Sequence, residues 1–338
     1  MQRRRLARTQ KTWPFLLGGL ALAGAAVAIS RAQTRSAAPR VTGPAAPERI
    51  RSATVDGIRM RWEQHGDDPA TALPVVFVHG LPTNPRAWRY VLPRVSNSGV
   101  CCLAWELVGF GGSLREGFGR DLSIPAQASY LRAWLRHLGI EKAVFVAHDY
   151  GGGVVQHLAT TSPDLFLGLV LTDSVAFDNW PVPAVKAARA MRSAIGHCPP
   201  RLLEPVFKGA LVNLGHTDQA VAAESRELFW RPYSGENGPS AFAHQLGFFS
   251  NQDTVRIGHD LHPLGCPTLV VWGEKDPLGL DSAEELAGRL DADLRVIEGA
   301  YHFTIEDHPN EIADAVQSVL SRVRSEESAG DRAGLLHS

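Results

Sequence analysis

The chain has 338 residues, of which 44% are hydrophobic and 20% are charged, as in a globular protein with a full core. Its length accommodates one large domain with an insertion or two smaller domains. The formal net charge of −1 excludes the basic face that nucleic-acid binding needs, so we expect no nucleic-acid partner.

The N-terminal part of the chain differs in composition from the rest. A basic segment precedes the uncharged apolar run Trp13–Ile29, whose length is at the lower limit for a membrane-spanning helix. Arginines before such a run favour transfer of the following chain across the membrane. We therefore predict a membrane anchor or a cleaved signal over residues 1–32 and a linker over 33–49, with the rest outside the cytoplasm. A start site set too early, before a cytosolic protein, is the third interpretation.

From residue 50 onward, short apolar runs alternate with helical patterns. A helix is predicted over Ser123–Gly139, because leucines recur at helical spacing and a glycine follows them. The apolar runs predict strands over Ile58–Gln64, Pro74–Gly80, Cys101–Glu106, Ala143–His148, Leu167–Asp173, Pro267–Gly273 and Asp293–Gly299. This alternation predicts an α/β fold with a mostly parallel sheet that helices cover on both faces.

The alternation stops between residues 175 and 264, where no strand pattern occurs and several stretches are amphipathic. We interpret this region as a helical cap over the carboxyl ends of the strands, where ligands of open α/β sheets bind. Residues 50–174 and 265–323 then form the two parts of the core, and residues 324–338 a disordered tail.

The segment Val144–Gln156, VFVAHDYGGGVVQ, has the pattern of a strand, a tight turn and a helix. Asp149 lies on the turn, in the place where hydrolases with such a strand–turn–helix elbow carry their nucleophile. Two further residues follow later strands, Asp276 in VVWGEKDP and His302 in EGAYHFTIEDHP. Nucleophile, acid and base in this chain order are typical of α/β-hydrolases.

The chain from about residue 50 to 323 resembles the α/β-hydrolases that have an aspartate nucleophile, a group that includes epoxide hydrolases and haloalkane dehalogenases. The segments His79–Pro93, HGLPTNPRAWRYVLP, and Val108–Ser113, VGFGGS, are similar to that group at the corresponding places. The resemblance implies the α/β-hydrolase fold, with Asp149, Asp276 and His302 as the catalytic triad.

A carboxylate nucleophile suits attack on a saturated carbon, where it forms an alkyl ester with the enzyme. His302 would activate the water that hydrolyses the ester, and Asp276 would orient the imidazole. Backbone N–H groups of Leu81 and Tyr150 would form the oxyanion hole. Some haloalkane dehalogenases carry the acid after the preceding strand, so Asp173 is the alternative acid.

The leaving group distinguishes the two activities. Haloalkane dehalogenases usually have a tryptophan at the position of Tyr150 and commonly an asparagine at that of Leu81, and this chain departs from both. Epoxide hydrolases typically use two cap tyrosines, but the cap contains only Tyr233, so Tyr150 is the candidate for the second donor.

The sequence His79–Pro82 fits the His-Gly-x-Pro motif of epoxide hydrolases, and we therefore favour epoxide hydrolysis. The alternatives are haloalkane dehalogenation with Trp180 or Trp230 as a halide donor, ester or lactone hydrolysis, and a non-catalytic ligand-binding role.

Aromatic residues in the predicted cap favour a small apolar organic substrate. We expect no cofactor, because the glycines of Val108–Ser113 lack the context of a dinucleotide fingerprint. We also expect no metal, because Cys101, Cys102, Cys198 and Cys266 lack the spacing of a zinc site.

Overall fold

The computed structural model describes residues 49–213 and 215–335. The predicted N-terminal anchor or signal lies outside these residues, as does all of the linker except Arg49, so both stay predictions. Within the part of the chain that is described, no helix is both long and apolar enough to cross a membrane.

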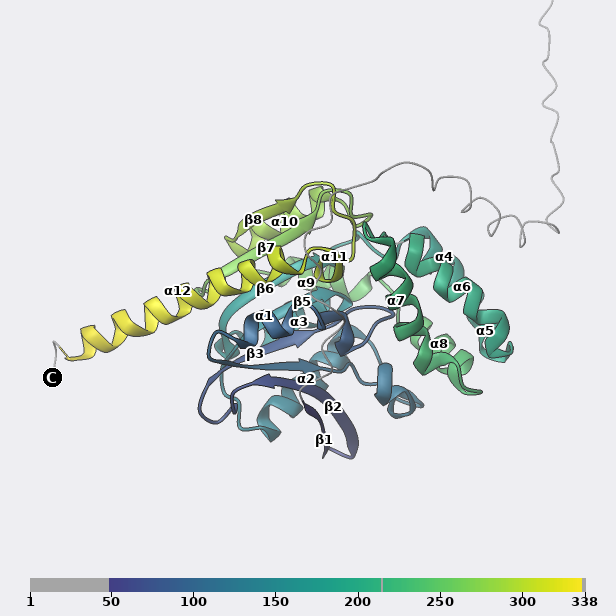
Figure 1. The fold of residues 1–338 in the computed structure, drawn as a ribbon, viewed down its shortest axis with the longest axis horizontal. Helices are drawn as coiled ribbons and strands as arrows, with labels where there is room; N and C mark the ends of the chain where they lie inside the picture. The colour runs from purple at the N-terminus through teal and green to yellow at the C-terminus, as the bar shows by residue number, and fades with distance from the viewer. Residues whose placement is uncertain (1–48, 214, 336–338) are drawn as a thin grey trace, which may run out of the picture. The chain divides into compact units, whose positions relative to one another are not determined.

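An eight-stranded sheet forms the centre of the described structure (Figure 1). The strands follow the order β1-β2-β4-β3-β5-β6-β7-β8, and β2 is antiparallel to both of its neighbours while the other pairs are parallel. The strands are β1 (Arg49–Val55), β2 (Ile58–Gly66), β3 (Leu73–Val78), β4 (Val100–Trp105), β5 (Ala143–Asp149), β6 (Phe166–Ser174), β7 (Thr268–Gly273) and β8 (Asp293–Ile297). The predicted mostly parallel sheet is confirmed. Strand β1 was not predicted, because it is a largely exposed edge strand with arginines in place of an apolar run.

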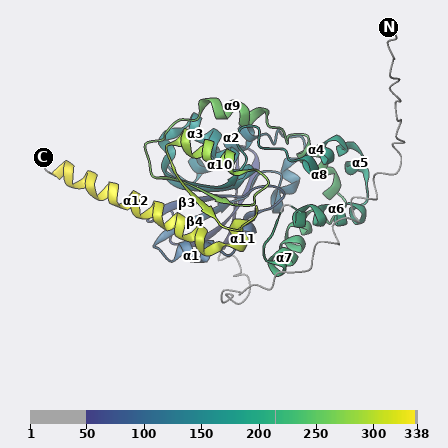
Figure 2. The ribbon, with the colours of Figure 1, turned by 90° about the horizontal axis from the view of Figure 1, so that it is seen from above.

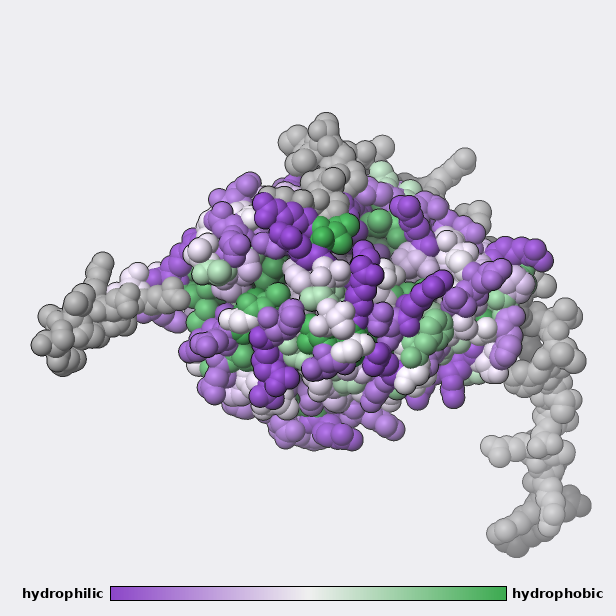
Figure 3. Space-filling view, turned by 90° about the horizontal axis from the view of Figure 1, so that it is seen from below, coloured by the Kyte–Doolittle hydropathy of each residue, from purple (hydrophilic) through white to green (hydrophobic). Residues whose placement is uncertain are grey.

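Helices cover both faces of this sheet, as predicted. Figure 2 shows α2, α3, α9 and α10 on one face and α1 and α12 on the other. Their bounds are α1 (Leu92–Ser96), α2 (Ile124–His137), α3 (Tyr150–Thr161), α9 (Gln252–Asp260), α10 (Leu280–Leu290), α11 (Thr304–Asp307) and α12 (Pro309–Leu335). Successive residues of β3 enter opposite cores: Val76 and Val78 pack in one cluster, Val75 and Phe77 in the other. The molecular face in Figure 3 carries mainly hydrophilic residues with smaller apolar areas between them.

Local sequence signals set the bounds of the longer core helices. Ser123 precedes α2 and its side chain accepts a hydrogen bond from the Ala126 N–H, which satisfies one of the free donors of the first turn. Gly139 follows the helix with a φ of 69°, a left-handed conformation that glycine adopts without strain. The predicted helix over Ser123–Gly139 is therefore confirmed with its two ends as caps.

The segment between β6 and β7 is helical. It contains α4 (Pro183–Ala190), α5 (Arg192–His197), α6 (Pro200–Asn213), α7 (Gln219–Trp230), the short 3-10 helix η5 (Arg231–Tyr233), α8 (Gly238–Leu246) and α9. Helices α4 to α8 gather beside the sheet in Figure 1. Helix α9 instead packs against α2 and α3. The cap therefore ends before α9, earlier than the predicted boundary at residue 264.

The C-terminal segment differs from the prediction of a disordered tail over residues 324–338. Helix α12 continues to Leu335, well beyond Val323, which is its last residue in the apolar core. Ser321 and Ser325 donate hydrogen bonds to backbone carbonyls one turn earlier, at Gln317 and Ser321.

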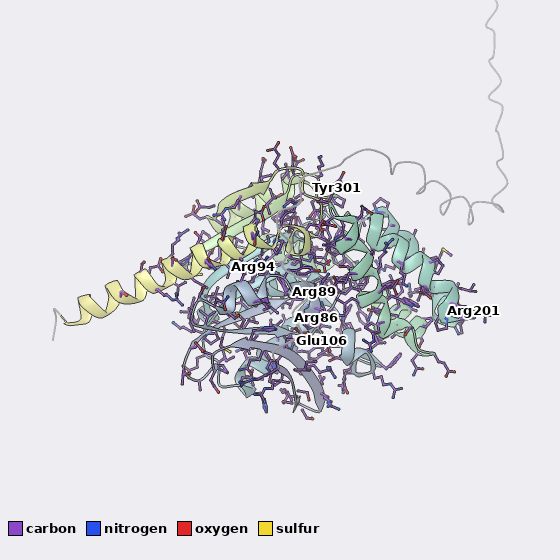
Figure 4. All side chains as sticks on the ribbon, in the orientation of Figure 1. Arg86, Arg89, Arg94, Glu106, Arg201 and Tyr301 are labelled. Atoms are coloured by element: carbon purple, nitrogen blue, oxygen red, sulfur yellow. The ribbon has the colours of Figure 1, made fainter. Side chains whose placement is uncertain are left out.

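A buried arginine connects the cap to the core. Arg89 follows the short 3-10 helix η2 (Pro85–Trp88), and Figure 4 shows it near the place where the cap meets the core. Its guanidinium forms an ion pair with Glu306 of α11. It also donates to Glu224 Oε1 (2.9 Å) and Ser225 Oγ (3.0 Å), both of α7. Arg89 and Glu306 are both fully buried, so each charge depends on the other.

We predict that Arg89→Met lowers the free energy of unfolding by about 3–5 kcal/mol, because it leaves the Glu306 carboxylate buried without a cation. Urea unfolding followed by circular dichroism measures the effect. Arg201→Met, which replaces an exposed arginine of the cap, is the matched control and should change the value by less than about 0.5 kcal/mol. Equal midpoints for the two variants would contradict the prediction.

Candidate active site

Asp149 lies on a strained turn between β5 and α3. Its backbone has φ 51° and ψ −121°, a conformation that costs a non-glycine residue roughly 1–3 kcal/mol. Glycines make the surrounding space possible. A Cβ on Gly80 would lie 2.4 Å from the Asp149 Cβ, and one on Gly151 would lie 2.4 Å from the Val78 carbonyl oxygen. The turn therefore holds the carboxylate against the loop that follows β3.

The structure brings Asp149, His302 and Asp276 together. His302 Nε2 lies 3.5 Å from Asp149 Oδ2, and His302 Nδ1 lies 3.0 Å from Asp276 Oδ2. The Leu278 N–H donates to the other Asp276 oxygen at 2.8 Å. All three side chains are buried. The imidazole thus lies between two carboxylates, with one ring nitrogen facing each.

Opposing effects set the charges of these three groups. Burial by itself raises the pKa of Asp149, but the hydrogen bond and charge of His302 outweigh it, and the net shift is downward. Burial is likewise outweighed by His302 at Asp276, whose pKa is also lowered. Burial lowers the pKa of His302, but Asp276 and Asp149 together raise it well above its ordinary value. These three shifts favour the charged forms of all three groups.

The two oxygens of Asp149 have different partners. The Leu81 N–H donates to Oδ1 at 2.6 Å, whereas Oδ2 faces His302. Tyr150 is the first residue of α3, so its N–H has no partner within the helix. The Leu81 donor is in the predicted place, and the Tyr150 N–H stays a prediction as the second donor.

Asp173, the alternative acid, lies beside Asp276 at the end of β6. It is fully buried, and its Oδ1 accepts the Gly273 N–H at 2.8 Å. The hydrogen bond of His302 Nδ1 is accepted by Asp276 Oδ2 and not by Asp173. The structure therefore places both candidate acids in the site, and Asp276 is the one hydrogen-bonded to the His302 imidazole.

The two predicted leaving-group donors use their hydroxyl protons elsewhere. The Tyr150 hydroxyl donates to the Leu122 carbonyl at 2.8 Å. The Tyr233 hydroxyl lies 3.0 Å from Gln245 Oε1, and Gln245 Nε2 donates to the Gly109 carbonyl. Since a carbonyl only accepts, the orientation of the amide is fixed and Tyr233 is the donor. Both phenols thus donate to protein oxygens in this structure, and their role as leaving-group donors stays a prediction.

Sequence reasoning missed Gln245, which connects Tyr233 of the cap to the turn after β4. It is fully buried, and both ends of its amide are hydrogen-bonded. No sequence motif contains Gln245. The one signal of a polar role is its position as an amide on an otherwise apolar face of its helix.

Trp180 and Trp230, the alternative halide donors, are both buried. The Trp180 indole N–H donates to Thr254 Oγ1 at 2.9 Å, so it too has a partner within the protein. Trp230 packs against Phe207 in the cap.

Two buried histidines surround the triad without belonging to it. His79 Nδ1 lies 2.9 Å from the Gly80 carbonyl, and its Nε2 accepts the Leu107 N–H at 3.1 Å. The ring is therefore neutral, and burial lowers its pKa to about 4. His148 Nε2 lies 3.0 Å from the His302 carbonyl, which fixes the backbone of the catalytic loop. Burial lowers the pKa of His148 to about 4 as well. Both rings are fully buried.

Within the described ranges, no group of three or more histidine, cysteine, aspartate or glutamate side chains is arranged to hold a metal ion. The site itself offers the Asp149 carboxylate, the His302 imidazole and the Leu81 N–H donor.

Comparison with known proteins identifies related families. A family model described as the alpha/beta hydrolase fold matches residues 74–309. Epoxide hydrolase A of Mycobacterium tuberculosis is 25% identical over 314 residues, a match that covers 80% of this chain and 97% of that protein. A haloalkane dehalogenase of Bradyrhizobium diazoefficiens is 34% identical over 126 residues, which cover 37% of this chain and 39% of the dehalogenase. The solved structure of an alpha/beta hydrolase fold protein from Burkholderia ambifaria has a TM-score of 0.71 at 23% identity, and covers 79% of this chain and 96% of that one.

The neutral state of His79 leads to a prediction about pH. Unfolded His79 binds a proton below about pH 6.5, whereas the folded residue stays neutral down to about pH 4. The contribution of His79 to stability therefore decreases as the pH is lowered through this range. The loss of stability on His79→Gln should therefore shrink by roughly 2 kcal/mol between pH 7 and pH 5. Urea unfolding at both pH values measures the difference, and His197→Gln, at an exposed histidine, is the control whose difference should stay constant. A pH-independent effect of His79→Gln would contradict the lowered pKa, because it would mean that folded and unfolded His79 bind protons equally.

Proposed function

The chain belongs to the alpha/beta hydrolase fold family, and we propose that it is an epoxide hydrolase with the Asp149 carboxylate as its nucleophile. One observation carries the proposal. The Leu81 N–H holds Asp149 Oδ1, while Oδ2 stays free of backbone donors and faces the imidazole of His302. This arrangement suits a carboxylate that attacks with one oxygen and later carries negative charge on the other.

In the first step, Asp149 Oδ2 attacks an epoxide carbon. The new C–O bond makes an ester, the ring C–O bond breaks, and its electron pair stays on the former ring oxygen as an alkoxide. That alkoxide takes up one proton and becomes the hydroxyl of a hydroxyalkyl ester. The lowered pKa of Asp149 supports this step, because the nucleophile must be ionised before it attacks.

In the second step, water attacks the ester carbonyl carbon, Cγ of Asp149. The water gives a proton to His302 Nε2, and the negative charge develops on Oδ1, where the Leu81 N–H already donates. Collapse of this intermediate breaks the bond between Cγ and Oδ2, so Oδ2 leaves with the product as an alkoxide, which takes up the proton from His302. The oxygen of the water stays on Cγ, and its second proton passes to His302, which restores the resting site. The products are a diol and the Asp149 carboxylate.

Ester formation also changes His302 from an acid to a base. In the resting site two carboxylates raise its pKa, and the neutral ester removes one of them. His302 must then lose a proton before it can activate water. Epoxide opening consumes one proton at the alkoxide, and this balances the proton that His302 loses. Departure of a halide consumes none, and this balance supports an epoxide as substrate.

The match to an epoxide hydrolase over 80% of the chain also supports this proposal, since the dehalogenase match covers 37%. Haloalkane dehalogenation is the second candidate, and one observation favours it. The hydroxyl protons of Tyr150 and Tyr233 are donated to protein oxygens, so an alkoxide has no free phenol unless Tyr233 exchanges Gln245 for substrate.

The first prediction from this mechanism is that His302→Gln accumulates a covalent ester on Asp149, because alkylation continues while ester hydrolysis loses its base. Intact-mass analysis after substrate addition measures the adduct. An epoxide adds its whole mass, whereas a haloalkane adds its mass minus that of the hydrogen halide. The double variant Asp149→Asn/His302→Gln is the control and should show no adduct. Absence of any adduct with either substrate panel would instead favour a different reaction or a non-catalytic ligand-binding role.

The second prediction concerns the proton that the alkoxide takes up. If Tyr233 turns from Gln245 to the substrate, Tyr233→Phe should slow epoxide opening by roughly 10²–10⁴-fold, as expected for loss of a general acid. The burst rate of ester formation in single-turnover experiments measures this step. Tyr90→Phe, which removes a phenol bonded to Glu224, is the matched control and should leave the rate nearly unchanged. An unchanged rate for Tyr233→Phe would exclude Tyr233 as the donor.

A further inference from the structure

The two candidate acids of the site are in direct contact, and this contact is unusual because both are buried. Asp173 is the second-last residue of β6, and Asp276 follows the neighbouring strand β7. Gly273 connects them, because its N–H donates to Asp173 Oδ1 at 2.8 Å and its carbonyl accepts the Asp276 N–H at 3.0 Å. The two carboxyl groups are also hydrogen-bond partners of each other. Two buried carboxyl groups that are hydrogen-bonded to each other need a proton between them, so one of the two is neutral. The question is which of the two is neutral.

The partners of Asp276 favour its charged form. Its Oδ2 accepts from His302 Nδ1 at 3.0 Å and its Oδ1 accepts the Leu278 N–H at 2.8 Å. A carboxylate gains most from an adjacent imidazolium, because the charge of His302 would otherwise be buried without compensation on that side.

The partners of Asp173 are neutral. Its Oδ1 accepts the Gly273 N–H at 2.8 Å, and its Oδ2 accepts hydrogen bonds from the hydroxyls of Thr172 (2.7 Å) and Thr304. No arginine or lysine is among its partners, and the ionisable groups that face it are Asp276 and His302. Asp173 also has a φ of 44°, a backbone conformation that non-glycine residues adopt rarely and that occurs at functional sites.

We propose that Asp173 is a neutral carboxylic acid that donates its proton in a hydrogen bond to the Asp276 carboxylate and so positions the acid of the triad. Asp173 acts through Asp276 and not on the substrate, and its role rests on the proposed function of the triad. Burial and the charge of Asp276 raise the pKa of Asp173 well above its ordinary value, in agreement with this assignment.

The consequence for the reaction is a fixed location for one proton. A hydrogen bond donated to Asp276 stabilises its ionised form and lowers its affinity for the Nδ1 proton of His302. The imidazole therefore keeps that proton on Nδ1, and Nε2 is the nitrogen that exchanges protons with water. The residue at the alternative acid position supports the acid that is in use.

Paired substitutions test the assignment. In Asp173→Asn the amide can still donate to Asp276 and its carbonyl can still accept the Gly273 N–H, so ester hydrolysis should stay within about threefold of the parent rate. Asp276→Asn should lose roughly 10³–10⁴-fold, the loss that follows when the imidazole loses its orienting carboxylate. Asp173→Leu removes the donor and should slow ester hydrolysis by about ten- to a hundredfold, and rescue by asparagine distinguishes positioning from packing. If Asp173→Asn is the severe variant and Asp276→Asn the mild one, the proposal is overturned.

A spectroscopic measurement keeps the assignment independent of activity. Infrared difference spectra of the full chain at neutral pH should show the carbonyl band of a protonated carboxylic acid that is lost in Asp173→Asn. The Asp149→Asn variant is the matched control and should retain the band. If the band is lost in Asp173→Asn but the parent protein catalyses no reaction, the proposed function is refuted while the assignment of the proton to Asp173 stands. Persistence of the band in that variant would overturn the proposal for Asp173.

Discussion

The buried contact between His302 and its two carboxylates is the interaction on which the rest of the site depends. Each of these groups would be strongly unfavourable in the interior without the others, because burial opposes ionisation of all three. Together they hold two negative charges and one positive charge, and backbone N–H groups of Leu81 and Leu278 supply additional donors. Loss of any one of the three groups leaves a buried charge without its partner. The contacts between them therefore also hold the loops that carry these residues.

The strand order explains how one edge of the sheet assembles this chain of charges. Strands β5, β6, β7 and β8 are consecutive neighbours in space, and the four groups follow their carboxyl ends. Asp149 is the last residue of β5 and Asp173 is the second-last residue of β6. Asp276 follows β7, and His302 follows β8. Parallel pairing therefore brings these residues to one edge of the sheet. Their contacts run from Asp149 to His302, from His302 to Asp276 and from Asp276 to Asp173.

Sequence patterns predicted the elements and the triad because both have strong local signals. Apolar runs mark β3 and β7, and the elbow places Asp149 at a strand–helix junction. The directions of the Tyr150 and Tyr233 hydroxyls could not be predicted, because they depend on partners at Leu122 and Gln245 that only the folded chain brings near. Edge strand β1 was missed for the opposite reason, since it is largely exposed and has no apolar pattern that a sequence could reveal.

The cap is joined to the core by polar contacts whose loss would alter the site without touching the triad. Tyr233 reaches the turn after β4 through Gln245, and Arg89 reaches α7 through Glu224 and Ser225. The first contact can exchange one hydrogen bond for another at little net change, because its groups are neutral. The second cannot, because Arg89 is tied to buried Glu306. A proton donor for the substrate is therefore expected from the Tyr233 side of the cap, while the Arg89 side holds the cap in place.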